Sequence, residues 1–326
     1  MKILVKAKIR VVILVFFMLI LLFNSFKFST NSFTSKNQYL ALKSSNYWTF
    51  SDRIYINNNW SVSKAMYEFI SGSGTFNDPY VLENVTFKNI DNVNNIITIE
   101  NSSDYFIIRN CKIDNSGTSI NNKNILISNA TKGLIENNTI SSNMGTGISL
   151  IHSNNISVIE NTLLNNSYIG IELNHSSYNH IFNNIASYQG KDTSYGYGIN
   201  LYKSHNNSIL QNTISYNSAI GILLGNSSNN NITLNSANHN YLGIRLTQTS
   251  NNNFVTQNNL KENTYCYIVD TDCEGNILEK NDCGPIGFEY YFFLIAFGIV
   301  LTLSLFGVIY FIRKRKKEKR ERKLLR

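Results

Sequence analysis

Short segments of alternating apolar and polar residues return along the middle of the chain at nearly constant intervals. Such alternation is typical of a β-strand with one buried face. A strand that returns every 22 or 23 residues predicts a solenoid of stacked coils. Five segments share glycine, isoleucine, a variable residue and leucine, with intervals of 23, 28, 23 and 22 residues: Gly147–Leu150, Gly170–Leu173, Gly198–Leu201, Gly221–Leu224 and Gly243–Leu246.

A second register consists of asparagines that recur at similar intervals, usually with an apolar residue two positions later. We interpret them as a ladder whose amides bond to one another between coils about 4.8 Å apart. Asparagine also tolerates the left-handed backbone of a sharp corner. The predicted ladder comprises Asn138, Asn161, Asn183, Asn212, Asn235, Asn258 and Asn281.

The residues that fill these units predict an all-β fold of about eight or nine coils. Helical repeats are excluded because β-branched residues and turn formers dominate the units. Pro79 and Pro285, the only prolines, bracket the region in which every coil needs its backbone donors. The longer units at 115–123 and 189–197 predict loops on the stack, where function usually lies.

Apolar segments lie near both ends of the chain. Residues 290–312 form an apolar run long enough to cross a bilayer, which predicts a transmembrane helix at 289–312, and the basic tail at 313–326 follows it. By the positive-inside rule this tail is cytoplasmic and the repeats lie outside the cell membrane. Residues 1–28 have the pattern of a signal peptide or signal anchor, with a linker at 29–52 before the solenoid at 53–284. We expect a single C-terminal span and a monomeric ectodomain.

The net charge of +8 comes from the two ends of the chain. Between residues 11 and 312 there are 15 basic and 19 acidic residues. A basic surface for nucleic acid is therefore absent from the repeats, and we expect neither a nucleic-acid partner nor a cofactor.

The repeats resemble a known family in the units 155–177 and 206–228 and in the lead-in at 72–82. They are similar to the NosD-like, or periplasmic-copper-binding-like, right-handed parallel β-helices, which overlap the β-helices of carbohydrate-binding proteins and sugar hydrolases. The resemblance covers residues 53–284 and implies a right-handed, pectate-lyase-like solenoid. It also implies copper or glycans as ligands. No catalytic motif of the family aligns, so no site residue is carried over.

Tyrosines around the longer unit at 189–197 are candidates for a glycan-binding face, because aromatic rings beside amides commonly bind sugars. Glu172 is the single acid in the outward column of the repeats, which runs through Ser149, Glu172, Asn200, Leu223 and Arg245. The candidate site comprises Tyr168, Glu172, Lys191, Asp192, Tyr195, Tyr197 and Tyr241.

His152 and His175 each follow a repeat leucine by two positions and form a candidate metal pair without an evident third ligand. Three cysteines crowd the final coil, and we expect a disulfide between Cys273 and Cys283. Cys111 aligns with Asn138 and is expected to be buried and unpaired.

The leading hypothesis is a non-catalytic cell-surface protein that binds glycans or other envelope components. The alternative is a polysaccharide lyase or hydrolase, which in acid/base hydrolysis needs two carboxyl groups about 5 to 9.5 Å apart. A copper-handling module is the third hypothesis. Two or more outward-facing carboxylates that converge in one groove with a lysine or arginine would favour the enzyme.

Overall fold

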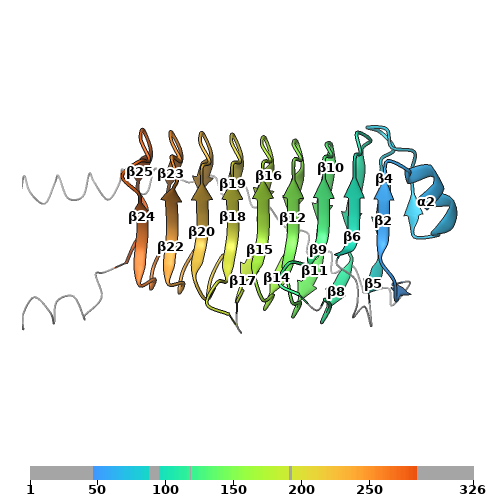
Figure 1. Ribbon diagram of the computed structural model, residues 1–326, viewed down its shortest axis with the longest axis horizontal. Coiled ribbons are helices and arrows are strands. Elements are labelled where there is room, and N and C mark those ends of the chain that lie inside the picture. Colours follow the sequence, from blue (N-terminus) through green and yellow to red (C-terminus); the bar gives the residue numbers. More distant parts are fainter. Residues whose placement is uncertain (1–46, 88–94, 118, 191–192, 285–326) are drawn as a thin grey trace, which may run out of the picture. The chain divides into compact units, whose positions relative to one another are not determined.

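The computed structural model describes residues 47–87, 95–117, 119–190 and 193–284. These residues form a parallel β-helix of about eight turns, whose strands stack side by side in three sheets that we name A, B and C (Figure 1). Sheet A ends at Ile185–Ser187, and the later coils continue it only through isolated bridges. The chain runs from sheet C to sheet A, then to sheet B and back to sheet C. The predicted all-β solenoid is therefore confirmed.

Every neighbouring pair of strands is parallel except β3 and β4. Sheet A contains β1 (Trp48–Phe50), β5 (Val85–Phe87), β8 (Lys112–Asp114), β11 (Thr139–Ser141), β14 (Thr162–Leu164) and β17 (Ile185–Ser187). Sheet B contains β2 (Ile54–Asn57), β6 (Asn95–Glu100), β9 (Lys123–Ser128), β12 (Thr146–Ile151), β15 (Ile169–Asn174), β18 (Tyr197–Tyr202), β20 (Ile220–Gly225), β22 (Leu242–Thr247) and β24 (Tyr265–Val269). Sheet C contains β3 (Ile70–Ser71), β4 (Tyr80–Glu83), β7 (Phe106–Arg109), β10 (Gly133–Glu136), β13 (Ser157–Ile159), β16 (His180–Phe182), β19 (Ser208–Leu210), β21 (Asn231–Thr233), β23 (Phe254–Thr256) and β25 (Ile277–Glu279).

The apolar positions of the repeat stack in columns inside the coils. The isoleucine of each Gly-Ile-x-Leu segment lies directly over that of the next coil, as Ile148 does over Ile171. Both side chains are fully buried, and each contributes about 1.5–3 kcal/mol by leaving water. The repeat glycine also faces inward. A Cβ on Gly198 would lie 2.1 Å from Cγ2 of Ile214, so only glycine lets sheets A and B approach at this position.

The asparagine ladder fills the corner between sheets C and A. The main-chain N–H of Asn138 donates to Oδ1 of Asn161 at 3.0 Å, and Nδ2 of Asn138 donates to the same oxygen at 2.9 Å. Nδ2 of Asn161 donates back to the carbonyl of Ile135 at 2.8 Å. Each ladder amide thus forms hydrogen bonds with the backbone of the preceding coil. The same contacts join Asn212, Asn235, Asn258 and Asn281.

Asn183 does not belong to the ladder, although the sequence pattern placed it there. Asn184 takes the position, and its Oδ1 accepts from the N–H of Asn161 at 2.9 Å. The sequence interpretation took Ile185 as the core residue that follows two positions later. Ile185 is 40% exposed, whereas Ala186 is fully buried, so the register predicted for this coil was wrong by one residue.

The left-handed backbone lies one residue before each ladder amide. In the coil of β15, four corner residues have φ between 50° and 60°: Glu160, Asn165, His175 and Tyr178. Each is followed by an inward polar residue, so the coils contain further columns that the sequence pattern did not reveal. A second amide column is Asn143, Asn166, Gln189, Asn217, Asn240 and Asn263. The third is Asn179, Asn207, Asn230, Asn253 and Asn276, and a serine column is Ser153, Ser176, Ser204, Ser227 and Ser250.

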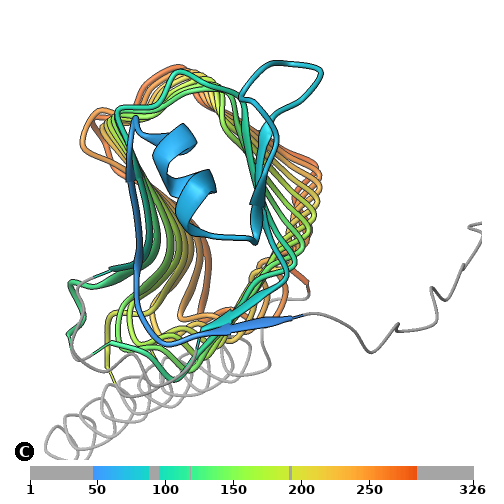
Figure 2. The ribbon, with the colours of Figure 1, turned by 90° about the vertical axis from the view of Figure 1, so that its right-hand side faces the viewer.

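Helix α2 (Trp60–Met66) covers the first coil and closes that end of the core (Figure 2). Its Trp60 is 1% exposed and stacks on Tyr80, with ring centroids 5.1 Å apart. The indole N–H donates to Oγ of Ser102 at 2.9 Å. The apolar interior is therefore sealed by an aromatic plug that satisfies its own polar atom.

The disulfide of the final coil joins Cys266 to Cys283, so the expected bridge between Cys273 and Cys283 was wrong. Cys266 occupies the repeat-glycine position, next to Gly243 in the preceding coil, and Cys283 occupies the apolar position that faces it from the side of sheet A. Their Cα atoms are 5.5 Å apart. Cys273 follows Ser250 in the serine column at another corner and is free.

No helix among the described residues is long and apolar enough to span a membrane. The expected signal segment at 1–28, the span at 289–312 and the basic tail at 313–326 lie outside those residues, as do Lys191 and Asp192.

Candidate functional site

Three of the predicted tyrosines gather where the chain turns from sheet A into sheet B. Tyr168 precedes β15 and Tyr197 begins β18 in the next coil, and their ring centroids are 6.1 Å apart. Tyr195, on the same turn, is 65% exposed. Desolvation, followed by the neighbouring Tyr168 and Tyr195, raises the pKa of Tyr197 above its ordinary value. We name these three residues the tyrosine cluster.

Hydrogen bonds tie the longer turn that carries Tyr195 and Tyr197 to the coils on both sides. Oγ1 of Thr193 donates to the carbonyl of Ser167 at 3.0 Å, and the N–H of Gly196 donates to Oγ of Ser218 at 2.9 Å. The N–H of Tyr197 donates to the carbonyl of Tyr168 at 3.0 Å. The described part of the turn therefore has a defined position on the stack.

Tyr241 lies in the same column as Tyr168 but three coils further on, about 14 Å away at 4.8 Å per coil. Its ring packs edge-on against Tyr265 with centroids 5.4 Å apart, and it is 55% exposed. The structure therefore does not bring Tyr241 into the tyrosine cluster.

A stack of three parallel rings, which sequence reasoning missed, runs across three successive coils where the chain leaves sheet A for sheet B. The rings of Tyr188 and Tyr216 are 4.9 Å apart and 3° from parallel, and those of Tyr216 and His239 are 4.4 Å apart and 7° from parallel. Nδ1 of His239 lies 3.1 Å from Oε2 of Glu262. We name Tyr188, Tyr216 and His239 the ring stack. Their intervals of 28 and 23 residues match the repeat and could have indicated the column.

Glu172 projects from the outer face of sheet B and is held by the two coils that precede it. Its Oε2 lies 2.8 Å from Nζ of Lys123 and accepts from Oγ of Ser149 at 2.8 Å. The side chains of Lys123 and Glu172 are only 17% and 13% exposed. The ammonium group of Lys123 thus neutralises the carboxylate of Glu172. Among the described residues, Glu172 belongs to no group of three His, Cys, Asp or Glu side chains that could hold a metal ion.

Two other carboxylates converge on an arginine, but on the outer face of sheet C. Nε of Arg109 lies 2.7 Å from Oε2 of Glu83, and Nη1 lies 3.9 Å from Oε1 of Glu136. The three residues stand in register in consecutive strands, with the guanidinium between the two acids. Glu160 does not join them, because Glu136 pairs with Ile159 and Glu160 falls on the following corner.

His152 and His175 lie at the corner between sheets B and C, with ring centroids 4.8 Å apart. Both are exposed and both have left-handed backbones. The structure therefore brings the pair together as the register predicts. Within the described chain no third histidine, cysteine or acid completes a metal-binding group.

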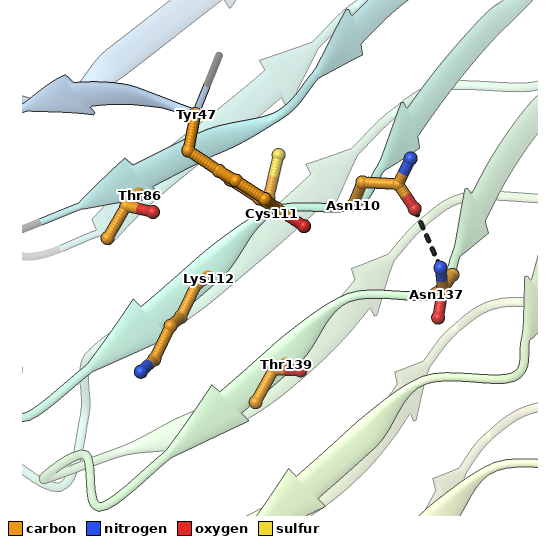
Figure 3. Close-up of a pocket in the computed structure, with 7 residues that line it drawn as sticks. All are labelled: Tyr47, Thr86, Asn110, Cys111, Lys112, Asn137 and Thr139. Carbon is orange, nitrogen blue, oxygen red and sulfur yellow. Dashed lines mark hydrogen bonds between the residues drawn. The ribbon is translucent and has the colours of Figure 1, made fainter. Parts of the chain in front are cut away.

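A pocket on sheet A, far along the stack from the tyrosines, is lined by Tyr47, Thr86, Asn110, Cys111, Lys112, Asn137 and Thr139 (Figure 3). Cys111 is 2% exposed, and its N–H donates to Oδ1 of Asn138 at 2.9 Å, so it heads the first amide ladder. Burial raises the pKa of its thiol to about 12. A thiol that stays protonated is a poor nucleophile, so this pocket has no reactive cysteine.

The sequence matches the description "Right handed beta helix region" over residues 42–192 and, in an overlapping match, over residues 123–283. The chain belongs to the right-handed β-helix family. The handedness expected from the repeats is therefore confirmed.

Several solved structures are similar to this chain. A mutant tailspike protein of E. coli bacteriophage HK620 gives a TM-score of 0.51 at 16% identity, covering 63% of this chain and 42% of its own. The surface adhesin PfbA of Streptococcus pneumoniae gives 0.45 at 13% identity, covering 64% and 68%. An alginate lyase from Paenibacillus gives 0.42 at 16% identity, covering 64% and 88%. The chain thus spans about two fifths of the tailspike's length, and no curated protein matches its sequence.

At these identities the similarity to the tailspike shows the fold alone. The functional residues of this right-handed β-helix are therefore argued from its own surface. The turns between sheets A and B carry both the tyrosine cluster and the ring stack. Glu172 on sheet B and Glu83 on sheet C, by contrast, are paired with a lysine and an arginine.

Proposed function

We propose that this β-helix is a non-catalytic surface protein that binds glycans through the tyrosine cluster. The observation that carries the proposal is the gathering of three partly or largely exposed rings on the A-to-B turns of two adjacent coils, the longer of which is held by hydrogen bonds to its neighbours. Aromatic faces in a preformed arrangement offer sugar rings a stacking surface at low entropic cost.

The ring stack adds a second aromatic surface to the same turn. Tyr188 and Tyr216 are each 47% exposed. Tyr188 is the first ring of the stack, and the corner one coil earlier is occupied by Asn165, whose amide is small. One face of Tyr188 therefore has no ring partner among the described residues, and a sugar ring could continue the stack there.

Replacing Tyr168, Tyr195 and Tyr197 together by alanine is expected to weaken glycan binding by roughly 10- to 1000-fold. Each ring contributes on the order of 0.5–1.5 kcal/mol, and every 1.4 kcal/mol is about tenfold in affinity. A glycan array probed with the full-length protein identifies the glycan that binds. Calorimetry then measures the affinity of the parent and of the triple variant for that glycan.

Tyr178→Ala is the matched control, because Tyr178 is 62% exposed but stands at the corner between sheets B and C. It should bind as the parent does, and all variants should keep the parent's circular dichroism and melting curve. Equal affinity of the triple variant and the parent would place any glycan site on another face. If the protein binds no glycan on the array, the proposed glycan-binding function is contradicted.

We further propose that the β-helix is displayed outside the cell membrane by a C-terminal span, with the basic tail at 313–326 in the cytoplasm. The apolar run at 290–312 and the ten basic residues after it support this orientation. Trypsin added to intact cells is expected to leave an epitope at Arg326 attached to the span, and to remove it only after permeabilisation. Loss of the epitope from intact cells would reverse the orientation.

Copper handling, which the NosD-like resemblance implies, is the second candidate function. The proximity of His152 and His175 favours it, because two imidazoles form part of many copper sites. Copper that binds the parent but not His175→Gln would support this function. Equal copper binding by the two proteins would reject it.

A further inference from the structure

The coils carry a recurring triplet, Asn-x-Ser or Asn-x-Thr, which is the acceptor of N-linked glycans in exported proteins. Its asparagine often stands at a left-handed corner, as Asn155 and Asn206 do with φ of 55° and 56°. Ser157 and Ser208, two positions later, begin β13 and β19. No amide of the first ladder begins the triplet, because a buried apolar residue such as Leu163 follows two positions later. The fold thus presents these acceptors on its outside.

Three of the acceptor asparagines have exposed side chains that form no hydrogen bond with any described residue: Asn155, Asn165 and Asn206. We name them the corner asparagines. By contrast, Nδ2 of Asn137, another exposed acceptor, donates to Oδ1 of Asn110 at 2.7 Å. A substituent on the amide nitrogen of a corner asparagine therefore breaks no contact within the described fold.

Each corner asparagine also stands one coil away from an exposed tyrosine. Asn155, Tyr178 and Asn206 occupy the same corner position in three successive coils, just before the residues joined by the third amide column. Asn165 stands one coil before Tyr188 in the same way. The two tyrosines are 62% and 47% exposed. Since coils lie about 4.8 Å apart, a sugar linked to a corner asparagine reaches the face of a tyrosine ring.

We propose that the corner asparagines carry N-linked glycans and that the first sugar of each packs on Tyr178 or Tyr188. The proposal rests on the proposed display outside the cell, where such glycans are found. The sugar that continues the ring stack at Tyr188 is then the chain's own, and the tyrosine cluster stays open.

The sugar donor is a polyprenyl phosphate or pyrophosphate that carries an oligosaccharide, used by a membrane transferase of the host. Nδ2 of the asparagine forms a bond to C1 of the first sugar, and the bond between C1 and the phosphate oxygen breaks. The amide gives up one proton to a base of the transferase, and the lipid leaves as its phosphate anion. No oxidant or reductant is needed.

The test uses the full-length protein purified from the membranes of its own host, with site-resolved mass spectrometry of its peptides. We expect a glycan mass on each of the three corner asparagines. Asn229 is the matched control within the same chain. It is exposed in the column of Asn206 and has φ of 59°, but Asn231, two positions later, offers no hydroxyl. Asn229 should therefore be unmodified.

Ser208→Ala is expected to abolish the glycan on Asn206, because the triplet loses its hydroxyl, whereas Ser208→Thr should keep it. The side chain of Ser208 is half-buried and forms no hydrogen bond with a described residue. Both variants should therefore keep the melting curve of the parent apart from the effect of the glycan itself.

Hydroxyl-radical labelling of tyrosine side chains tests the packing. In the double variant Ser157→Ala and Ser208→Ala, Tyr178 should be labelled at least about twofold faster than in the parent, since both faces of its ring are then open. Tyr241, which is 55% exposed and lies on a turn between sheets A and B, should be labelled at the same rate in both proteins.

The proposal is wrong if all three corner asparagines are unmodified, or if Asn229 is modified as often as they are. Equal labelling of Tyr178 in the parent and the double variant would refute the packing of the sugar on its ring. A protein whose tail is protected in intact cells but whose corner asparagines are bare is displayed without glycans, which refutes this proposal alone. Glycan binding by the tyrosine cluster is decided separately, by the array.

Discussion

Replacing Asn184 by leucine is expected to lower the free energy of unfolding by at least about 3 kcal/mol, because several buried polar groups lose their partner at once. Oδ1 of Asn184 accepts from the N–H of Asn161 at 2.9 Å, and Nδ2 donates to the carbonyl of Val158 at 2.8 Å and to Oδ1 of Asn212 at 3.0 Å. Leucine can satisfy none of these groups, and the larger apolar side chain does not fit the corner.

The neighbouring substitution Asn183→Gln is the matched control. Asn183 is exposed at a left-handed corner that Gln211 and Gln257 occupy in other coils, so we expect a change within about 0.5 kcal/mol. Thermal unfolding followed by circular dichroism measures both variants, and Asn184→Leu should melt roughly 6–12 °C below the parent. Equal melting temperatures for the two variants would mean that the ladder does not stabilise the coils.

Replacing Cys266 and Cys283 together by serine is expected to destabilise the final coil by about 3 kcal/mol, since the bridge closes a loop across 17 residues. The loss should be local, because a solenoid coil contacts only its neighbours. Hydrogen exchange in β24 and β25 should therefore accelerate far more than exchange in β12 or β15.

Cys273→Ser should leave exchange and melting unchanged, since Cys273 is free and serine is what the other coils carry in that column. If Cys273→Ser reproduced the double variant, the bridge would involve Cys273 instead of Cys266. A reductant should accelerate hydrogen exchange in the final coil of the parent to the level of the double variant. It should have the same effect on Cys273→Ser, which keeps the bridge.

The fold could be predicted because stacking imposes the same environment on the same position in every coil. Gly170, Ile171 and Leu173 have equivalents in each repeat, so one pattern reports many contacts. Asn183 and Asn184 show the limit of this reasoning. Adjacent asparagines are chemically identical, and only the packing of Ala186 rather than Ile185 decides which of them faces inward.

The candidate site was less accessible to sequence reasoning. Tyr168 and Tyr197 could be placed side by side because the repeat glycine sets their register. The ring stack was missed because its residues occupy a corner that Asn165 and Ser142 fill elsewhere, and a turn position does not indicate stacking. The bridge between Cys266 and Cys283 depends on contact between successive coils across the interior, which spacing alone does not show.

The ladders also make the β-helix directional. The N–H of Asn138 is satisfied by the side chain of Asn161, and that of Asn161 by Asn184, so the corner of each coil is completed only by the coil that follows it. A nascent chain that begins at the plug formed by Trp60 would add coils in the order in which they are synthesised, each closing its predecessor. Assembly would therefore proceed in one direction, from the first coil to the last. In the complete β-helix, Asn281 is the ladder amide at the end where growth stops.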